Sequence, residues 1–141
     1  MRQVVVDASL AAMWVIPEPN SEAALDRAAR WAVEGTRILA PCLLLAELTN
    51  ALYKRIVRRE LDLETALTGL DVALAFPIEL REEPEMPARA IELAYRLGRP
   101  TTYDCHYLAL AEHEDCELWT GDRRFFNAVR RSTPRVRWVG S

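Results

Sequence analysis

Short apolar segments of strand length alternate with helical segments along almost the whole chain, and this alternation restricts the fold more than any other feature. The five strand-like segments are 3–7, 36–41, 77–82, 116–120 and 135–140. The first of them, QVVVD, is a continuous apolar run typical of a strand buried on both faces of a parallel sheet. Strands that alternate with helices predict an α/β domain with a mostly parallel sheet.

The segments between these strands carry helical patterns and helix boundary residues. The segment 21–35 follows Asn20 and ends at Gly35, residue types that commonly start and stop a helix. The other expected helices are 43–57, 61–76, 86–98, the segment that holds Asp104, and a short one within 122–131. With 141 residues the chain is one ordinary domain long, so we expect a single domain over 1–141.

Asp104 lies where a carboxylate is unexpected. In the helical segment PTTYDCHYLALAE, positions 104, 107, 108 and 111 fall within one stripe at about 100° per residue, and the other three are apolar. Asp104 therefore heads the face that a helix normally buries. The structural alternative is a capping box, in which Asp104 pairs with Thr101 and only stabilises the start of the helix.

Three further carboxylates occupy comparable places. Asp7 ends the first strand, Asp122 follows the strand ELWT, and Glu47 stands at the rim of the buried stripe of its helix. Each has a structural alternative, because an aspartate can cap a helix and Glu47 can pair with Lys54 or Arg55. Parallel sheets, however, bind ligands at the carboxyl ends of their strands, where these acids are expected to lie.

Together the four acids predict a cation site. Carboxylates that come close without partners repel one another, which raises their pKa values and destabilises the fold. A hard divalent cation such as Mg²⁺ or Mn²⁺ removes this cost and prefers sites made only of oxygen ligands. A bound metal would explain why Asp104 faces inward.

Charge and composition narrow the class of protein. The net charge of −3 does not indicate a general polyanion binder, although six arginines and two acids from Glu117 onward give a local balance of +4. A second basic cluster lies within 54–59.

The sequence contains no apolar run near the roughly 20 residues that span a membrane, and its N-terminal segment lacks a signal-peptide pattern. Three widely spaced cysteines are typical of reduced thiols, so we expect a cytoplasmic protein.

Four motifs in this order resemble those of the PIN-domain ribonucleases, most of all the VapC-type toxins of bacterial and archaeal toxin–antitoxin pairs. The motifs are VVVDAS, PCLLLAELTNAL, TTYDCHYLALAE and LWTGDRRFFNAV, and they span nearly the whole chain. The resemblance implies a three-layer α/β/α sandwich around a parallel sheet. The acidic quartet of the family maps onto Asp7, Glu47, Asp104 and Asp122, and its neighbouring polar residues map onto Ser9, Asn50 and Thr120.

The resemblance also implies a function. It implies one or two Mg²⁺ or Mn²⁺ ions at the acidic site, hydrolysis of RNA phosphodiester bonds, and a homodimer silenced by a cognate antitoxin. Arg123 and Arg124 are candidates for contact with the RNA backbone, because they follow Asp122 directly. The chain departs from the family pattern at Gly121, where alanine is frequent, and at Cys105 and His106, which are bulkier than usual.

Two other interpretations are possible. A phosphorelay receiver is also a small parallel-sheet domain with clustered acids and Mg²⁺, but it needs a lysine near the end of the sheet. The only lysine here is Lys54, on a predicted helix. A catalytically silent PIN-like domain could bind RNA or a protein partner without cutting, although the chain retains all four acids.

Overall fold

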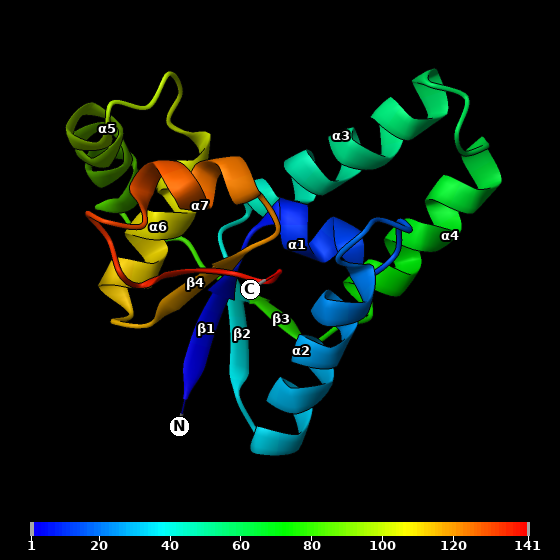
Figure 1. The fold of residues 1–141 in the computed structure, drawn as a ribbon, viewed down its shortest axis with the longest axis horizontal. Helices are drawn as coiled ribbons and strands as arrows, with labels where there is room; N and C mark the ends of the chain where they lie inside the picture. The colour runs from blue at the N-terminus through cyan, green and yellow to red at the C-terminus, as the bar shows by residue number, and fades with distance from the viewer. Residues whose placement is uncertain (1, 141) are drawn as a thin grey trace.

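The computed structural model describes residues 2–140, which build a five-stranded parallel sheet with helices on both faces (Figure 1). The strands are β1 (Gln3–Val6), β2 (Arg37–Ala40), β3 (Ile78–Leu80), β4 (Glu117–Thr120) and β5 (Val136–Trp138). Their order across the sheet is β3-β2-β1-β4-β5, and every neighbouring pair is parallel. The predicted parallel α/β fold is confirmed, including the weak strand at 77–82.

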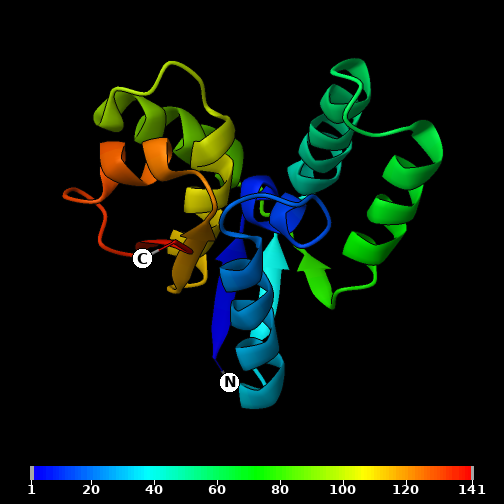
Figure 2. The same cartoon turned by 45° about the vertical axis from the view of Figure 1, so that its right-hand side comes forward.

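The helices form two layers around this sheet. They are α1 (Ala8–Met13), α2 (Ser21–Glu34), α3 (Leu43–Val57), α4 (Leu63–Leu74), α5 (Met86–Leu97), α6 (Tyr103–His113) and α7 (Arg123–Val129). The chain crosses the sheet in one direction from β1 to β3 and in the other from β3 to β5. Because parallel crossovers are right-handed, α1 to α4 cover one face and α5 to α7 the other (Figures 1 and 2). The predicted α/β/α sandwich is therefore confirmed.

The central strand β1 explains the apolar run at the start of the chain. Val4, Val5 and Val6 are fully buried, and Val5 lies between Leu39 of β2 and Leu118 of β4. A strand covered by helices on both faces has no polar face, so its side chains do not alternate in character. The strand ends at Asp7, the first residue of the candidate site.

Aromatic contacts fix the position of α1, the helix that follows Asp7. The Trp14 ring stacks on Phe76 with centroids 4.1 Å apart, and its indole N–H donates a hydrogen bond to the Ala24 carbonyl. On the same side of the sheet, Trp31 packs edge-on against Trp119 at 5.8 Å. These contacts tie α1 to α2 and to the end of α4, and they hold the residues after β1 in place.

Most helix boundaries agree with the sequence patterns. Helix α3 covers the predicted segment 43–57, and α2 and α5 end at Gly35 and Gly98, whose φ angles of 70° and 63° are left-handed. Helix α1 was not predicted as an element of its own. Figure 2 shows α3 and α4 as an antiparallel pair that projects beyond the sheet. None of the helices among the described residues is long and apolar enough to cross a membrane.

Gly121, the residue before Asp122, lies where a Cβ atom would crowd the end of the Met13 side chain and the Ser9 carbonyl. A Cβ atom there would be 2.8 Å from the Met13 Sδ atom and 3.0 Å from the Ser9 carbonyl oxygen. The side chain of Met13 in α1 therefore occupies the space that the methyl group of an alanine at position 121 would take.

We predict that Gly121→Ala lowers the free energy of unfolding by about 1 kcal/mol, because the new methyl group displaces the end of the Met13 side chain. In a double-mutant cycle with Met13→Ala, the two costs should be less than additive, since the smaller side chain makes room. Urea denaturation of the four proteins measures this coupling. Strictly additive costs would show that Met13 is not the obstacle.

Candidate active site

Asp7 connects the central strand to α1 and is buried, with 5% of its surface exposed. Its Oδ1 atom accepts hydrogen bonds from the Ser9 hydroxyl at 2.6 Å and from the Leu10 backbone N–H at 3.0 Å, and its Oδ2 atom accepts one from Thr120. Burial raises the pKa of Asp7 from 3.8 to about 6, despite these hydrogen bonds. Asp7 is therefore the N-cap of α1, which was the structural alternative for this residue. It is also a buried acid whose ionised form is disfavoured.

Ser9 and Thr120 join the ends of β1 and β4. The Thr120 hydroxyl donates to Asp7 and accepts a hydrogen bond from the Asp122 backbone N–H at 2.9 Å. The Ser9 hydroxyl donates to Asp7 and accepts one from the Gly121 N–H at 3.0 Å. Both hydroxyls therefore fix the Asp7 carboxylate relative to the chain that leads to Asp122.

Glu47 lies on α3 and faces the same edge of the sheet. Its Oε1 atom accepts a hydrogen bond of 2.6 Å from the hydroxyl of Tyr107, a residue of α6 that is almost fully buried. Burial raises the pKa of Glu47, and the negative charge of Asp104 raises it further. The alternative ion pair with Arg55 is wrong, because Arg55 binds Glu18 and Glu60 instead.

Asp104 lies in the first turn of α6, and the capping-box alternative for it is wrong. The N-cap of α6 is Thr102, which makes no side-chain cap hydrogen bond. Burial raises the pKa of Asp104, the charge of Asp122 raises it further, and Arg99 opposes both effects from 3.5 Å away. Asp122 itself caps α7 by accepting a hydrogen bond from the Phe125 N–H.

A cavity of about 290 Å³ gathers these acids from four separate elements. The residues that line it are Asp7, Ala8, Ser9, Glu47, Asn50, Ala51, Lys54, Asp104 and Asp122. All four predicted acids and two of the three predicted polar residues therefore meet in one place. The third, Thr120, lies beneath the cavity, fully buried and bonded to Asp7.

Three residues of the site were not assigned from the sequence, and the two candidates for contact with the RNA backbone lie outside the cavity lining. Tyr107 was recognised only as part of an apolar stripe, and nothing singled out Arg99. Lys54 was expected on the same side of α3 as Glu47, but it was not assigned to the site. Arg123 and Arg124 are exposed and are not among the described residues that line the cavity; the Arg123 guanidinium lies over Trp138.

The donor atoms of the cavity suit a hard divalent cation. Its candidate ligands are oxygens, from four carboxylates and from the amide of Asn50. Three of the four carboxyl groups have raised pKa values, so close approach and burial disfavour their ionised forms. A divalent cation favours the ionised forms and removes that cost.

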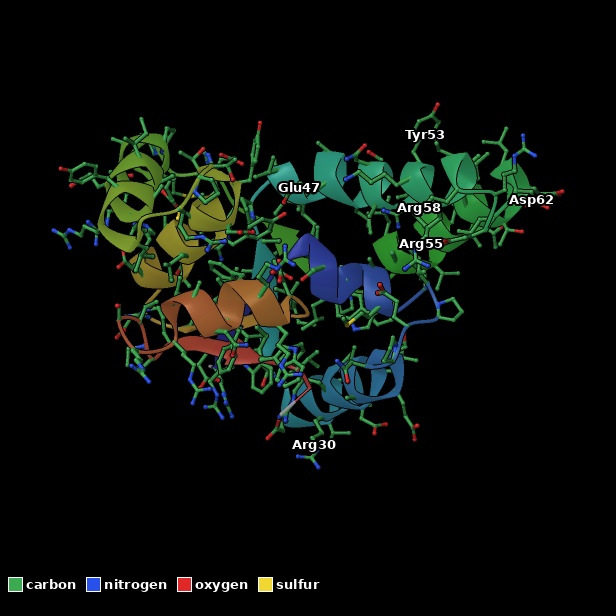
Figure 3. All side chains as sticks on the ribbon, turned by 45° about the horizontal axis from the view of Figure 1, so that its top comes forward. Arg30, Glu47, Tyr53, Arg55, Arg58 and Asp62 are labelled. Atoms are coloured by element: carbon green, nitrogen blue, oxygen red, sulfur yellow. The ribbon has the colours of Figure 1, made fainter. Side chains whose placement is uncertain are left out.

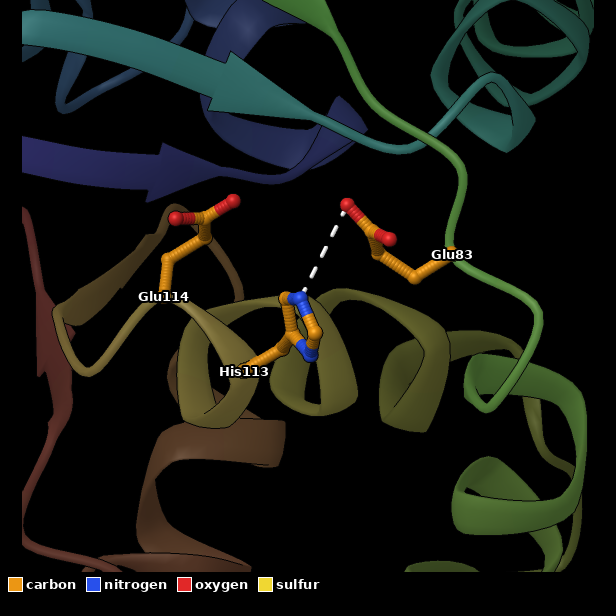
Figure 4. A group of neighbouring side chains, drawn as sticks. All are labelled: Glu83, His113 and Glu114. Atoms are coloured by element: carbon orange, nitrogen blue, oxygen red, sulfur yellow. Dashed lines mark ion pairs between the residues drawn. The ribbon is translucent and has the colours of Figure 1, made fainter.

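A second group with possible metal ligands lies at the other end of α6. Glu83, His113 and Glu114 each place one ligand atom within 4.8 Å of the others (Figure 4). Glu114 already accepts hydrogen bonds from Arg81 and Gln3, and His113 lies 3.7 Å from Glu83. These contacts indicate an ion-pair network that joins the loop after β3 to α6.

Comparison with known proteins gives a consistent result. The sequence model of one family, described as the PIN domain, matches residues 4–131. Ribonuclease VapC1 of Mycobacterium tuberculosis (strain CDC 1551 / Oshkosh) is 42% identical over 86 residues, which cover 60% of this chain and 62% of that protein. The aligned part is thus less than two thirds of the length of that relative.

Solved structures share the fold over almost the whole chain. PAE2754 from Pyrobaculum aerophilum has a TM-score of 0.71 at 25% identity, and the match covers 99% of this chain and 92% of that one. VapBC2 from Rickettsia felis, solved bound to a DNA fragment from its promoter, has a TM-score of 0.69 at 16% identity and covers 96% of both chains. At that identity the second likeness concerns the fold alone.

The raised pKa of Asp7 predicts how stability depends on pH when chelator is present. Folding raises this pKa from 3.8 to about 6, so the folded chain holds the proton more tightly than the unfolded chain does. This contribution to stability is fully present below about pH 4, is lost as the pH rises past 6, and amounts to about 3 kcal/mol. The free energy of unfolding of wild type should therefore fall, relative to that of Asp7→Asn, between about pH 4 and pH 7.

Urea denaturation of both proteins across this pH range measures the difference directly. Because the other acids titrate in both proteins, subtraction isolates Asp7. A difference that stays constant with pH would contradict the raised pKa.

Proposed function

The chain belongs to the PIN-domain family, and on this premise we propose that it is a metal-dependent endoribonuclease that acts as the toxin of a toxin–antitoxin pair. One observation carries the proposal: four carboxylates from four separate elements line a single cavity. The similarity to a VapC ribonuclease supports RNA as the substrate.

Asp7, Glu47 and Asp104 are the proposed principal ligands of Mg²⁺ or Mn²⁺. Asp122 holds a second ion or orients a water molecule, directly or through Thr120, whose hydroxyl bonds to the Asp122 N–H. When bound, the metal supplies a water of lowered pKa and offsets the negative charge of the phosphodiester. Four carboxylates alone would repel that anion.

Neighbouring residues orient two of these carboxylates and bring a positive charge to the cavity. Ser9 and Thr120 hold both oxygens of Asp7, so the carboxylate keeps one orientation. Tyr107 does the same for one oxygen of Glu47. Lys54 brings a positive charge to the cavity wall, where it can meet a phosphate.

The wider biological role is also a proposal. We infer one functional domain over 1–141, an RNA substrate and a cognate antitoxin as partners, and action in the cytoplasm, where cellular RNA lies. A homodimer is consistent with Leu63, Leu67 and Leu74, which α4 leaves exposed.

The purified chain, freed of any antitoxin, should cleave a mixed pool of cellular RNA in Mg²⁺ or Mn²⁺, and chelator should stop it. Asp104→Asn should lower the rate at least about 100-fold, because it removes a metal ligand. Gel analysis of the RNA measures cleavage. Mg²⁺ should also raise the melting temperature of wild type but not of the variant.

Asp26→Asn is the matched control, since Asp26 is an exposed acid on α2, outside the cavity. It should cut RNA as wild type does. A folded wild-type chain that binds metal but leaves every RNA in the pool intact would favour a silent domain that binds RNA or a protein partner.

Tyr107→Phe should weaken binding of Mn²⁺ by about 10- to 100-fold, because Glu47 loses the hydrogen bond that orients it. The free energy of unfolding should fall by about 1–3 kcal/mol. Paramagnetic resonance titration of Mn²⁺ measures the affinity. Tyr95→Phe, at an exposed tyrosine on α5, is the control. Equal affinity in the two variants would mean that Tyr107 serves packing alone.

A further inference from the structure

A second cavity adjoins the acidic one. It has a volume of about 310 Å³ and lies between α1 and α3, and we call it the α1–α3 groove. Ser9, Ala51, Lys54 and Asp122 line both cavities. The two spaces therefore share a wall, and a chain bound in one can continue into the other.

One stripe of α3 leads from the acids into this groove. Counted at about 100° per residue, Glu47, Ala51, Lys54 and Arg58 lie within roughly 60° of one another around the helix axis. Along this stripe the side chains change from the carboxylate of Glu47, at the acidic cavity, to two successive cations, Lys54 and Arg58. Figure 3 shows Arg58 on the side of α3 that faces α1, whereas Tyr53 points the opposite way.

The two cations of the stripe have no acidic partner. Arg55, their neighbour, is held by Glu18 at 2.9 Å and by Glu60 at 2.8 Å. Within residues 2–140, by contrast, neither Lys54 nor Arg58 makes an ion pair or a side-chain hydrogen bond. Both therefore remain available for an anionic ligand.

Part of the lining of the groove is apolar, and its two carboxylates are Glu18, which is paired with Arg55, and Asp122. Three nearly buried residues of the α1 region line the apolar part: Ala12, Met13 and Ile16. An apolar surface beside two cations suits a nucleotide, whose base can lie on the apolar side while its phosphate meets a positive charge. A base that is paired and stacked in a duplex cannot place its face on such a surface, so the groove suits single-stranded RNA.

We propose that the α1–α3 groove holds the single-stranded RNA nucleotides next to the scissile bond, with Lys54 and Arg58 at successive phosphates. This inference rests on the proposed ribonuclease function. RNA is a continuous polymer, so the nucleotides that flank a bond held at the four acids must leave the site along one of its open sides. The groove is the side that shares a wall with the acids and carries unpaired cations.

The test is the salt dependence of RNA binding. A fluorescent, mixed-sequence single-stranded RNA oligonucleotide is titrated with the full wild-type chain in Ca²⁺, which binds oxygen ligands as Mg²⁺ does but activates water less, so that the acids keep a cation while cleavage is suppressed. Arg58→Gln should weaken binding several-fold at low salt and reduce the slope of log affinity against log salt by about 0.7, the value for one lost phosphate contact. Its melting temperature should not change, because Arg58 is exposed.

Arg30→Gln is the matched control, since it removes the same charge from an exposed position on α2, away from the groove (Figure 3). Its slope and affinity should equal those of wild type. If Arg58→Gln behaves like Arg30→Gln, the inference is wrong, and the groove is left to an acidic segment of a protein partner. Cleavage by the wild-type chain decides the proposed function separately, because the binding assay does not depend on catalysis.

Discussion

The burial of carboxylates beside other carboxylates at one edge of the sheet is the constraint on which the rest of the site depends. Burial raises the pKa values of Asp7, Glu47 and Asp104 most; the charge of Asp104 raises those of Asp7 and Glu47 further, and the charge of Asp122 raises that of Asp104. If no cation bound here, replacing these acids with uncharged residues would stabilise the chain. Neutral donors nevertheless bond to three of these acids, Asp7, Glu47 and Asp122, and a preformed cation site requires such a fixed arrangement.

The fold supplies the rigidity for this arrangement. Asp7 follows a strand that is buried on both faces, and Thr120 ends the neighbouring strand, so their hydrogen bond joins the buried ends of two strands of the sheet. Glu47 lies on α3, on the opposite face of the sheet from α6, and the hydroxyl of Tyr107 in α6 donates a hydrogen bond to it. The acids thus converge from both helical layers, because the carboxyl ends of parallel strands open toward the same edge.

Much of this was predictable from periodicity. The strands follow from short apolar runs between helical segments. The span of α3 and the inward position of Asp104 follow from the pattern of 3.6 residues, which also placed Glu47 at the rim of a buried face. Side-chain partners across the fold were not predictable, since no local pattern joins Tyr107 to Glu47 or Arg99 to Asp104. Nearness in sequence favoured Arg123 and Arg124 as RNA contacts, which stays a prediction, and the cavity adds Lys54 beside the acids. The functions of the four acids stay a prediction.

The central claim is that the four acids form a divalent metal site, and diffraction with anomalous scattering from crystals grown in Mn²⁺ tests it most directly. The account predicts an anomalous peak within the cavity, with oxygens of Asp7, Glu47 and Asp104 as ligands and Asp122 beside it. A cavity without a peak, or Mn²⁺ bound only at Glu83, His113 and Glu114, would contradict it.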